Sequence, residues 1–345
     1  MWFEELVGFP EGSVPESRGA DVRARLRIEG EEMVSTVNGR RMRCGSLELA
    51  SLDELRRRTA GLGGGSAQLS LREVVGNAGW LHRDERNAGA VFQAASQFNL
   101  LEMVAPEVTP EAGIAGYEND ATQGPACAVA CGAGTILRNY FVEVNGRIGQ
   151  SADNQIDCLA DVGVHLFGAG AGAGDGDGNG DAGPAWTMRN GYAMFDAAGL
   201  ERVDDRLASM SAAELDEVRA RLRVGVHHDV EVTTAPSGHV VTQVYCSALP
   251  VAYNRLPSEA FERFARLVLE AAYEATLRAA ALATARSGNP TVFLTMLGGG
   301  VFGNDTAWII DAIDRACTMA ADLPLDVAIV SFRSSSPAVA ELVGR

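Results

Sequence analysis

The sequence of this 345-residue chain predicts a three-layer α/β/α fold with a mostly parallel mixed sheet, an N-terminal extension and a large insertion. Its second half alternates apolar, β-branched runs with stretches of helical periodicity, which is typical of a parallel sheet covered by helices on both faces. One of these runs, residues 291–297, ends in three glycines just before a new helix. A hydrophobic content of 47% is enough for a large core.

The second half supplies most of the expected elements. The expected strands and helices are, in order, strand 239–249, helix 261–287, strand 291–297, helix 305–320 and strand 325–332. The first helix should stop near Ser287-Gly288, because glycine commonly follows a helix C-terminus. The second has Asn304 or Asp305 as a natural N-cap.

The first half is less regular. Residues 1–66 are expected to form an N-terminal appendage, with a hairpin around Asn38-Gly39, a helix at 52–59 and a glycine-rich linker at 62–66. The main domain is then expected to span 67–345.

The main domain should open with a strand before Gly76-Asn77, a polar turn and a second strand at 89–95. A helix is expected at 124–141, with Pro125 in its first turn. An insertion at about 142–225 interrupts the α/β pattern and carries a low-complexity glycine tract.

Charge and composition exclude several classes of partner. The formal net charge is −16 at pH 7, which argues against direct binding to a nucleic-acid backbone or an anionic membrane. No apolar run approaches the ~20 residues that span a bilayer, and the N-terminus lacks the pattern of a signal peptide. The six cysteines are scattered without a CxxC pair, so we expect reduced thiols and a cytoplasmic location.

The glycine turn predicts an anion site. Glycines let backbone N–H groups approach a phosphate closely, and a following helix N-terminus adds unpaired donors and partial positive charge. The candidate phosphate-binding residues are therefore Gly298, Gly299, Gly300, Val301, Phe302, Gly303 and Asn304. A tight strand-to-helix connection that binds nothing explains the same pattern.

Four motifs in the right order resemble the macrodomain superfamily, the ADP-ribose-binding α/β fold. That family has a strand with a G-D-[IV]-T turn, a strand ending N-A-A-N, a helix with A-Y-x-x-x-L, and a strand ending S-[ST]-G-[VI]-[YF]-G. This chain has Gly76-Asn77, then 89–96 ending in Ser96, then Ala272-Tyr273 with Leu277, and then 299–303. The resemblance covers about 69–100 and 239–332 and implies a macrodomain-like fold.

The resemblance implies a ligand site with two departures. Asn77 stands where the family has the acidic residue at adenine, and Ser96 replaces the second Asn of N-A-A-N at the distal ribose. Gln97 and Asn99 could bind ribose hydroxyls, and Gln123 lies where a phosphate or ribose would be; Asn99 could equally stabilise a turn. ADP-ribose or a related nucleotide is the expected partner.

Two carboxylates are candidates for catalysis. Asp120 precedes the helix expected from 124, where it could orient a water as general base or simply cap the helix. Glu102 is the second candidate, and a solvated loop acid is the alternative reading. Both lie in the segment 99–124 that stands where the family has its glycine-rich phosphate loop.

No metal or cofactor is expected. Cys127 and Cys131 lie four apart but lack further ligands, so buried small side chains explain them. Residues 175–186 imitate the start of an EF-hand loop, yet the twelfth position is Trp186 instead of glutamate. His227-His228 on a strand permits a paired-histidine site, although ordinary strand residues are the simpler reading.

Three functions remain open from the sequence. The chain could be an enzyme that binds ADP-ribose or a related nucleotide and hydrolyses an ADP-ribosyl linkage. It could be a non-catalytic module for the same ligand, which the departures at Asn77 and Ser96 favour. It could also be a scaffold that uses segments 1–66 or 142–225 to bind a protein partner.

Overall fold

The computed structural model describes residues 1–64, 68–168 and 184–345. A seven-stranded mixed sheet with the order β4-β11-β12-β6-β13-β14-β5 runs through the molecule. The neighbouring pairs from β12 to β5 are all parallel, while β11 is antiparallel to both β12 and β4. The sheet strands are β4 (Ser46–Ser51), β5 (Ser70–Val75), β6 (Val91–Ala95), β11 (Arg223–Glu231), β12 (Val240–Cys246), β13 (Thr291–Leu294) and β14 (Asp326–Ser331).

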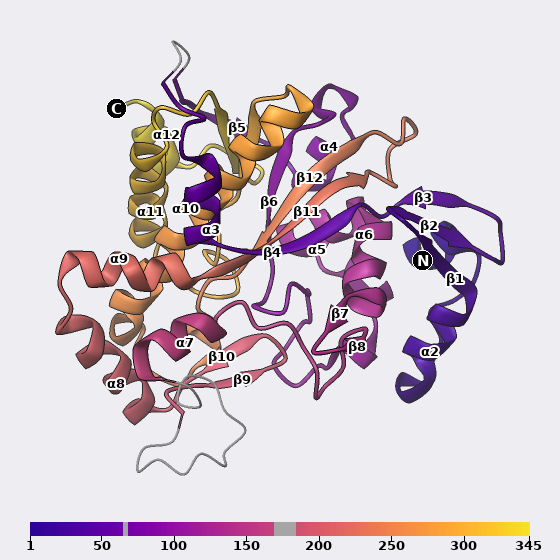
Figure 1. Cartoon of the computed structure of the whole chain (residues 1–345), viewed down its shortest axis with the longest axis horizontal. Helices are drawn as coiled ribbons and strands as arrows, with labels where there is room; N and C mark the ends of the chain where they lie inside the picture. The colour runs from indigo at the N-terminus through magenta and orange to yellow at the C-terminus, as the bar shows by residue number, and fades with distance from the viewer. Residues whose placement is uncertain (65–67, 169–183) are drawn as a thin grey trace.

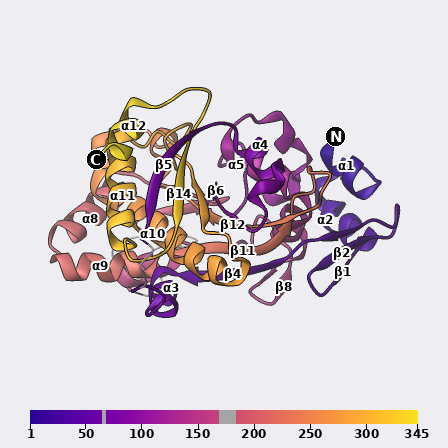
Figure 2. The ribbon, with the colours of Figure 1, turned by 90° about the horizontal axis from the view of Figure 1, so that it is seen from above.

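Helices cover both faces of this sheet, so the predicted three-layer α/β/α class is confirmed (Figures 1 and 2). On one face lie α3 (Leu52–Thr59), α9 (Ala212–Arg221), α10 (Glu262–Ser287), α11 (Thr306–Met319) and α12 (Pro337–Val343). On the other lie α4 (Ala78–Arg83), α5 (Gln123–Ala130) and α6 (Gly132–Ile136). The expected strands and helices of the second half, and the predicted helix at 52–59, are therefore confirmed.

The long helix α10 lies against the sheet because its buried side is almost entirely small and aliphatic. Alanines at 271, 272, 275, 279 and 280 are buried, which lets the sheet and α11 approach closely. Gly288 ends the helix in the left-handed conformation, with a φ of 77°, and its N–H donates to Thr284 O. The stop predicted at Ser287-Gly288 is thus confirmed.

An ion-pair network ties the outer helices of this face together. Glu274 of α10 is fully buried and accepts hydrogen bonds from Arg56 of α3 and Arg315 of α11. Asp216 of α9 accepts from the same two arginines. Because the buried carboxylate is met by two guanidinium groups, its desolvation is compensated and four helices are fixed in register.

The N-terminal segment packs onto the opposite side. It contains α1 (Trp2–Val7), α2 (Pro15–Arg25) and a three-stranded sheet of β1 (Leu26–Glu29), β2 (Glu32–Ser35) and β3 (Arg41–Arg43). The hairpin predicted around Asn38-Gly39 joins β2 to β3. The next strand, β4, pairs with β11 of the main sheet. The appendage thus donates an edge strand to the main domain, and its boundary near residue 66 stays a prediction.

Two predicted stretches differ from the structure. The polar turn after Asn77 contains the short helix α4, because the Asn77 side chain accepts from Gly79 N at 2.8 Å and caps it. The helix expected over 124–141 is broken at Cys131 and ends in a π-helical turn, Leu137–Phe141. A Cβ at Gly132 would lie 2.7 Å from the Trp2 ring, so α1 packs tightly onto the break.

The segment expected as an insertion forms small elements beside the main sheet. They are β7 (Glu143–Val144), β8 (Arg147–Ile148), α7 (Ala160–Phe167), β9 (Thr187–Arg189), β10 (Tyr192–Met194), α8 (Ala197–Ala208) and α9. The hairpin β9–β10 lies against the segment that follows β6, because Phe98 N donates to Gly191 O in its turn.

Candidate functional site

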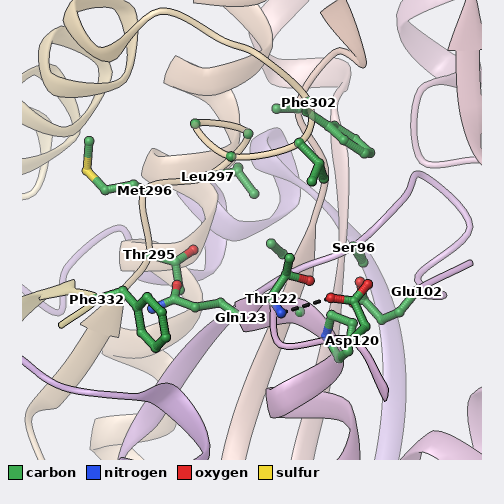
Figure 3. Close-up of a pocket in the computed structure, with 18 of the residues that line it drawn as sticks. Ser96, Glu102, Asp120, Thr122, Gln123, Thr295, Met296, Leu297, Phe302 and Phe332 are labelled. Carbon is green, nitrogen blue, oxygen red and sulfur yellow. Dashed lines mark hydrogen bonds between the residues drawn. The ribbon is translucent and has the colours of Figure 1, made fainter. Parts of the chain in front are cut away.

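A pocket of about 730 Å³ opens where several parallel strands end (Figure 3). β6 leads into Ser96 and Gln97, β13 into the glycine turn, and β14 into Phe332. The carboxyl edge of a parallel sheet is where α/β proteins commonly bind ligands, because strand ends and helix N-termini converge there. The lining is completed by residues 102–104, 120–125, 295–302, 330–332 and 334–337 with Tyr192, Ala248 and Tyr253.

The loop after β6 is held rigidly by its own polar side chains. Gln97 pairs with the backbone of Met103 twice, accepting from its N–H at 2.8 Å and donating to its carbonyl at 3.2 Å. Asn99 accepts from Leu101 N at 3.1 Å, and the Tyr117 hydroxyl accepts from Glu102 N at 2.9 Å. These bonds fix the backbone on both sides of Glu102.

Two further contacts hold this loop against the rest of the molecule. Leu100 takes a positive φ of 65°, which a branched residue adopts only when its surroundings enforce it. Its carbonyl accepts from the buried Arg138 at 3.2 Å. A Cβ at Gly191 would lie 2.6 Å from Gln97 and Asn99, so the β9–β10 hairpin closes directly over the loop.

Glu102 is a buried acid without a hydrogen-bond partner for one oxygen. Its side chain is 6% exposed, and Oε1 has no partner within the described residues. Burial raises the pKa of this carboxyl well above 4.5; Arg138 opposes the shift and Asp120 adds to it. Burial therefore favours the protonated form of this acid over its carboxylate.

Helix α5 begins at the same pocket with free backbone donors. Its N-cap, Thr122, makes no side-chain cap, and Pro125 has no N–H. The N–H groups of Gln123 and Gly124 have no partner among the described residues. Gly124 also lacks a side chain where a Cβ would collide with Glu102 and Ala95, so the acid can approach this helix end.

Asp120 lies just before this helix. Its side chain is partly exposed and accepts from Thr122 N at 2.8 Å, which bends the chain into the first turn of α5 (Figure 3). It lines the pocket together with Glu102. The two carboxyl groups thus differ in environment, one buried and one wet, which is how acid and base roles are separated.

The glycine turn is built differently from its sequence expectation. The positive φ angles fall at Gly298, 75°, and Gly303, 70°, while a Cβ at Gly300 would meet open space. Asn304 closes the turn by donating to Leu249 O at 2.8 Å. Asp305 caps α11 by accepting from Ala307 N, so the N-cap predicted at Asn304 or Asp305 is confirmed at Asp305.

Aromatic side chains form two patches in the pocket. Tyr192, Tyr253 and Phe302 contact one another with ring centroids 5.1–5.7 Å apart. Phe332 is 44% exposed and lies across the pocket from Glu102 and Asp120 in the view of Figure 3. The loop after Phe332 is tied down by Glu73, which accepts from Ser335 Oγ and Ser336 N. Phe332 and the partly exposed Tyr253 and Phe302 offer apolar faces to a ring, while Tyr192 is buried.

The structure gathers most of the predicted site residues. Those lining the pocket are Ser96, Gln97, Glu102, Asp120, Gln123, Gly298, Gly299, Gly300, Val301 and Phe302. Four predicted ligand-binding residues do not line it: Asn77 caps α4, Asn99 bonds within its loop, and Gly303 and Asn304 complete the turn. Ligand binding by the residues that do line the pocket stays a prediction.

The two cysteines and two histidines singled out in the sequence have structural surroundings. Cys127 and Cys131 are free and fully buried, and burial raises the pKa of both thiols. His227 and His228 both contact arginines. Within the described ranges, no group of three potential ligands could hold a metal ion. The calcium-like stretch, apart from its last residues, lies in 169–183, outside the described residues.

Comparisons with known proteins give structural matches alone. No protein-family model matches the sequence, and no curated protein matches it. The chain is similar in fold to a poly(ADP-ribose) glycohydrolase from Thermomonospora curvata, with 13% identity, a TM-score of 0.40, and coverage of 95% of this chain and 97% of that one. A poly(ADP-ribose) glycohydrolase from Deinococcus radiodurans in complex with ADP-ribose gives 12% identity and a TM-score of 0.40, covering 86% and 91%. At these values, no residue role is transferred to this chain.

Several pocket residues escaped the sequence analysis. Tyr192 and Tyr253 come from distant segments, and nothing local in the sequence marks them. A signal did exist for the Ser334-Ser335-Ser336-Pro337 run, because small hydroxyl residues after a buried strand fall at the carboxyl edge of a parallel sheet.

In the part of the chain that the structure describes, no helix is long and apolar enough to cross a membrane.

Gly298 and Gly300 should respond differently to alanine. Gly298→Ala forces a side chain into a positive φ and to within 2.5 Å of Ala248, so we expect a loss of about 1–3 kcal/mol in the free energy of unfolding. Gly300→Ala adds a methyl group in open space and should change it by less than about 0.5 kcal/mol. Denaturant unfolding measures both; equal losses would show that the turn is built differently.

Proposed function

We propose that this protein binds ADP-ribose or a related nucleotide in the pocket and hydrolyses an ADP-ribosyl linkage there. One observation carries the proposal: the buried Glu102, whose pKa is raised, lies beside the uncapped N-terminus of α5 in a single pocket. An uncapped helix end favours a phosphate, and a buried neutral acid next to a wet carboxylate favours acid–base cleavage. The pocket volume lies within the range of ~300–1,000 Å³ usual for small-molecule sites.

The ligand is assigned from the pocket and from the sequence resemblance to macrodomains. The free N–H groups of Gln123 and Gly124, with the exposed backbone at 299–301, supply donors for a diphosphate. Phe332 offers a face for a base, and the Tyr192–Tyr253–Phe302 patch packs near Glu102 for the ribose. ADP-ribose combines these groups in one molecule.

The cleavage would divide its proton transfers between the two acids. Glu102 gives its proton to the leaving atom as the bond to the anomeric carbon breaks. Asp120 takes a proton from the water that attacks this carbon. The products are free ADP-ribose and the protonated leaving group, and the proton on Asp120 returns to Glu102 through solvent. Burial of Glu102 raises its pKa and so favours the protonated form that acts as the acid.

Ligand binding should stabilise the wild-type protein and weaken with a bulky residue at 300. ADP-ribose at 100 times its dissociation constant should raise the free energy of unfolding by about 2.7 kcal/mol.

Gly300→Val should stay folded, since its Cβ meets open space, yet bind ADP-ribose at least about tenfold more weakly by calorimetry because the turn can no longer approach a phosphate. Unchanged affinity would place the phosphate elsewhere.

Removal of either acid should separate catalysis from binding. Asp120→Asn and Glu102→Gln should each lower turnover of ADP-ribosylated substrate by about 100-fold or more, while ADP-ribose affinity stays within a few-fold. Exposed Glu107→Gln, on the same loop segment, is the matched control and should leave turnover unchanged. Unchanged turnover in Asp120→Asn would leave Glu102 as the sole candidate.

Two other outcomes would replace the proposal. Measurable ADP-ribose binding with no turnover of any ADP-ribosylated protein or polymer would favour a non-catalytic binding module. Binding to none of ADP-ribose, NAD and AMP would favour a scaffold that uses segments 1–66 or 142–225 to hold a protein partner.

A further inference from the structure

Arg138 is a buried arginine whose hydrogen-bond partners include no carboxylate. Its side chain has no exposed surface, and it lies on the π-helical turn behind the pocket. Its guanidinium donates to Leu100 O and to Thr135 Oγ1 at 2.9 Å, and stacks on the Tyr245 ring with 3.6 Å to the centroid. It makes no ion pair with any described carboxylate, which is unusual for a guanidinium that stays charged.

His227 does not supply the missing negative charge. Its Nε2 lies 2.8 Å from Cys44 O, which can only accept, so Nε2 carries the proton. Its Nδ1 therefore accepts from Arg138 at 3.1 Å. Burial lowers the pKa of His227 well below 6.5, and Arg138 lowers it further, so the ring is neutral. A buried charge without a counter-ion is costly, so we expect a nearby group that this cation stabilises.

Glu102 is the group on which Arg138 acts. The Arg138 side chain bonds to Leu100, two residues before the acid, and opposes the effect of burial on the Glu102 carboxyl. Other elements bring titratable groups close to Glu102, but among the described residues Arg138 is the cation that acts on this carboxyl. The titratable groups that interact with Glu102 or Arg138 are Tyr117, Asp120, Cys127, Cys131, Tyr192, His227, Tyr245 and Cys246.

We propose that Arg138 is a positioning residue with two roles: it holds the Glu102 loop and stabilises the Glu102 carboxylate formed when this acid gives up its proton. The inference rests on the proposed function for its catalytic meaning, but not for its electrostatics. Without a nearby cation, a carboxyl buried as Glu102 is would release its proton too reluctantly to act as an acid. Arg138 never touches the substrate.

The step is a proton transfer with the charges balanced inside the protein. The Glu102 O–H bond breaks as the proton moves to the leaving atom, and the carboxylate that remains gains the Arg138 guanidinium as its counter-charge. When solvent returns the proton, the pair reverts to a neutral acid and a lone cation. The resting site thus carries its unpaired charge on Arg138, where neutral partners hold it in place.

The pH profile of turnover is the first test. Glu102 acts in its protonated form, so kcat falls as pH rises through its pKa. Arg138→Gln removes the charge, and the alkaline limb should move up by about one pH unit while the plateau of kcat drops about tenfold or more. Arg138→Lys keeps the charge and should leave the limb near its wild-type position. Arg286→Gln is the matched control, because Arg286 contacts the neighbouring His228 but not the Glu102 loop.

The second test needs no turnover. Above pH ~4.5 the folded state keeps a proton on Glu102 that the unfolded state loses, so stability falls as pH rises until the folded-state pKa is passed. The advantage of Glu102→Gln over wild type should grow through this window and then level off. In the Arg138→Gln background, the levelling should occur at higher pH by about one unit. Denaturant unfolding from pH 4 to 9 of the wild type, Glu102→Gln, Arg138→Gln and the double variant measures this shift.

The outcomes separate this inference from the proposed function. A shift in the unfolding cycle without any turnover keeps the electrostatic role of Arg138 and removes the enzyme. Turnover with an alkaline limb and an unfolding cycle that are both unaffected by Arg138→Gln overturns the inference. If Arg138→Gln does not fold, Arg138→Met, which keeps the length of the stem, replaces it in both tests, and the same results decide.

Discussion

The site depends on one constraint: the loop from Gln97 to Met103 keeps a glutamic acid out of water. Folding leaves Oε1 of Glu102 without a partner, at a cost that a flexible loop would avoid by opening to solvent. Gln97 and Tyr192 donate to Met103 O, and the Tyr117 hydroxyl accepts from Glu102 N, and these hydrogen bonds prevent that opening. The pKa of this acid is therefore raised because the fixed backbone keeps it buried, not because its own carboxyl is hydrogen-bonded.

The sheet brings the rest of the site to this acid. β6 leads into the Glu102 loop, its parallel neighbour β13 into the glycine turn, and β14 into Phe332, so three strand ends supply a carboxyl, a bare backbone and a ring. Helix α5 starts at the same edge, and Gly124 lets the acid lie against its first turn. Segments outside the core sheet complete the arrangement, since the β9–β10 hairpin covers the loop and α1 packs over the break after α5.

The sequence predicts the frame better than the site. Apolar runs at 240–246, 291–294 and 326–331 are buried on both faces, so their pattern alone identifies central parallel strands. Glu102, Asp120 and the glycine turn could be proposed because each follows or precedes an element with a clear signal. Arg138, Tyr192 and Tyr253 could not, because their roles arise from contacts between distant segments. Asn77 is a ligand candidate in the sequence, and Asn99 is either a ligand candidate or a turn residue. Both short amide side chains accept from nearby backbone N–H groups, a local competition that the sequence cannot resolve.

The protonation state of Glu102 tests the central claim most directly. Carboxyl carbon NMR of protein labelled with ¹³C-glutamate, with Glu102→Gln used to assign the resonance, follows this one group through a pH titration. The account predicts that the Glu102 signal remains that of a protonated acid across the range in which the exposed glutamates ionise, because burial raises its pKa well above 4.5. A Glu102 signal that titrates together with the exposed glutamates would contradict it, and with it the assignment of Glu102 as the acid.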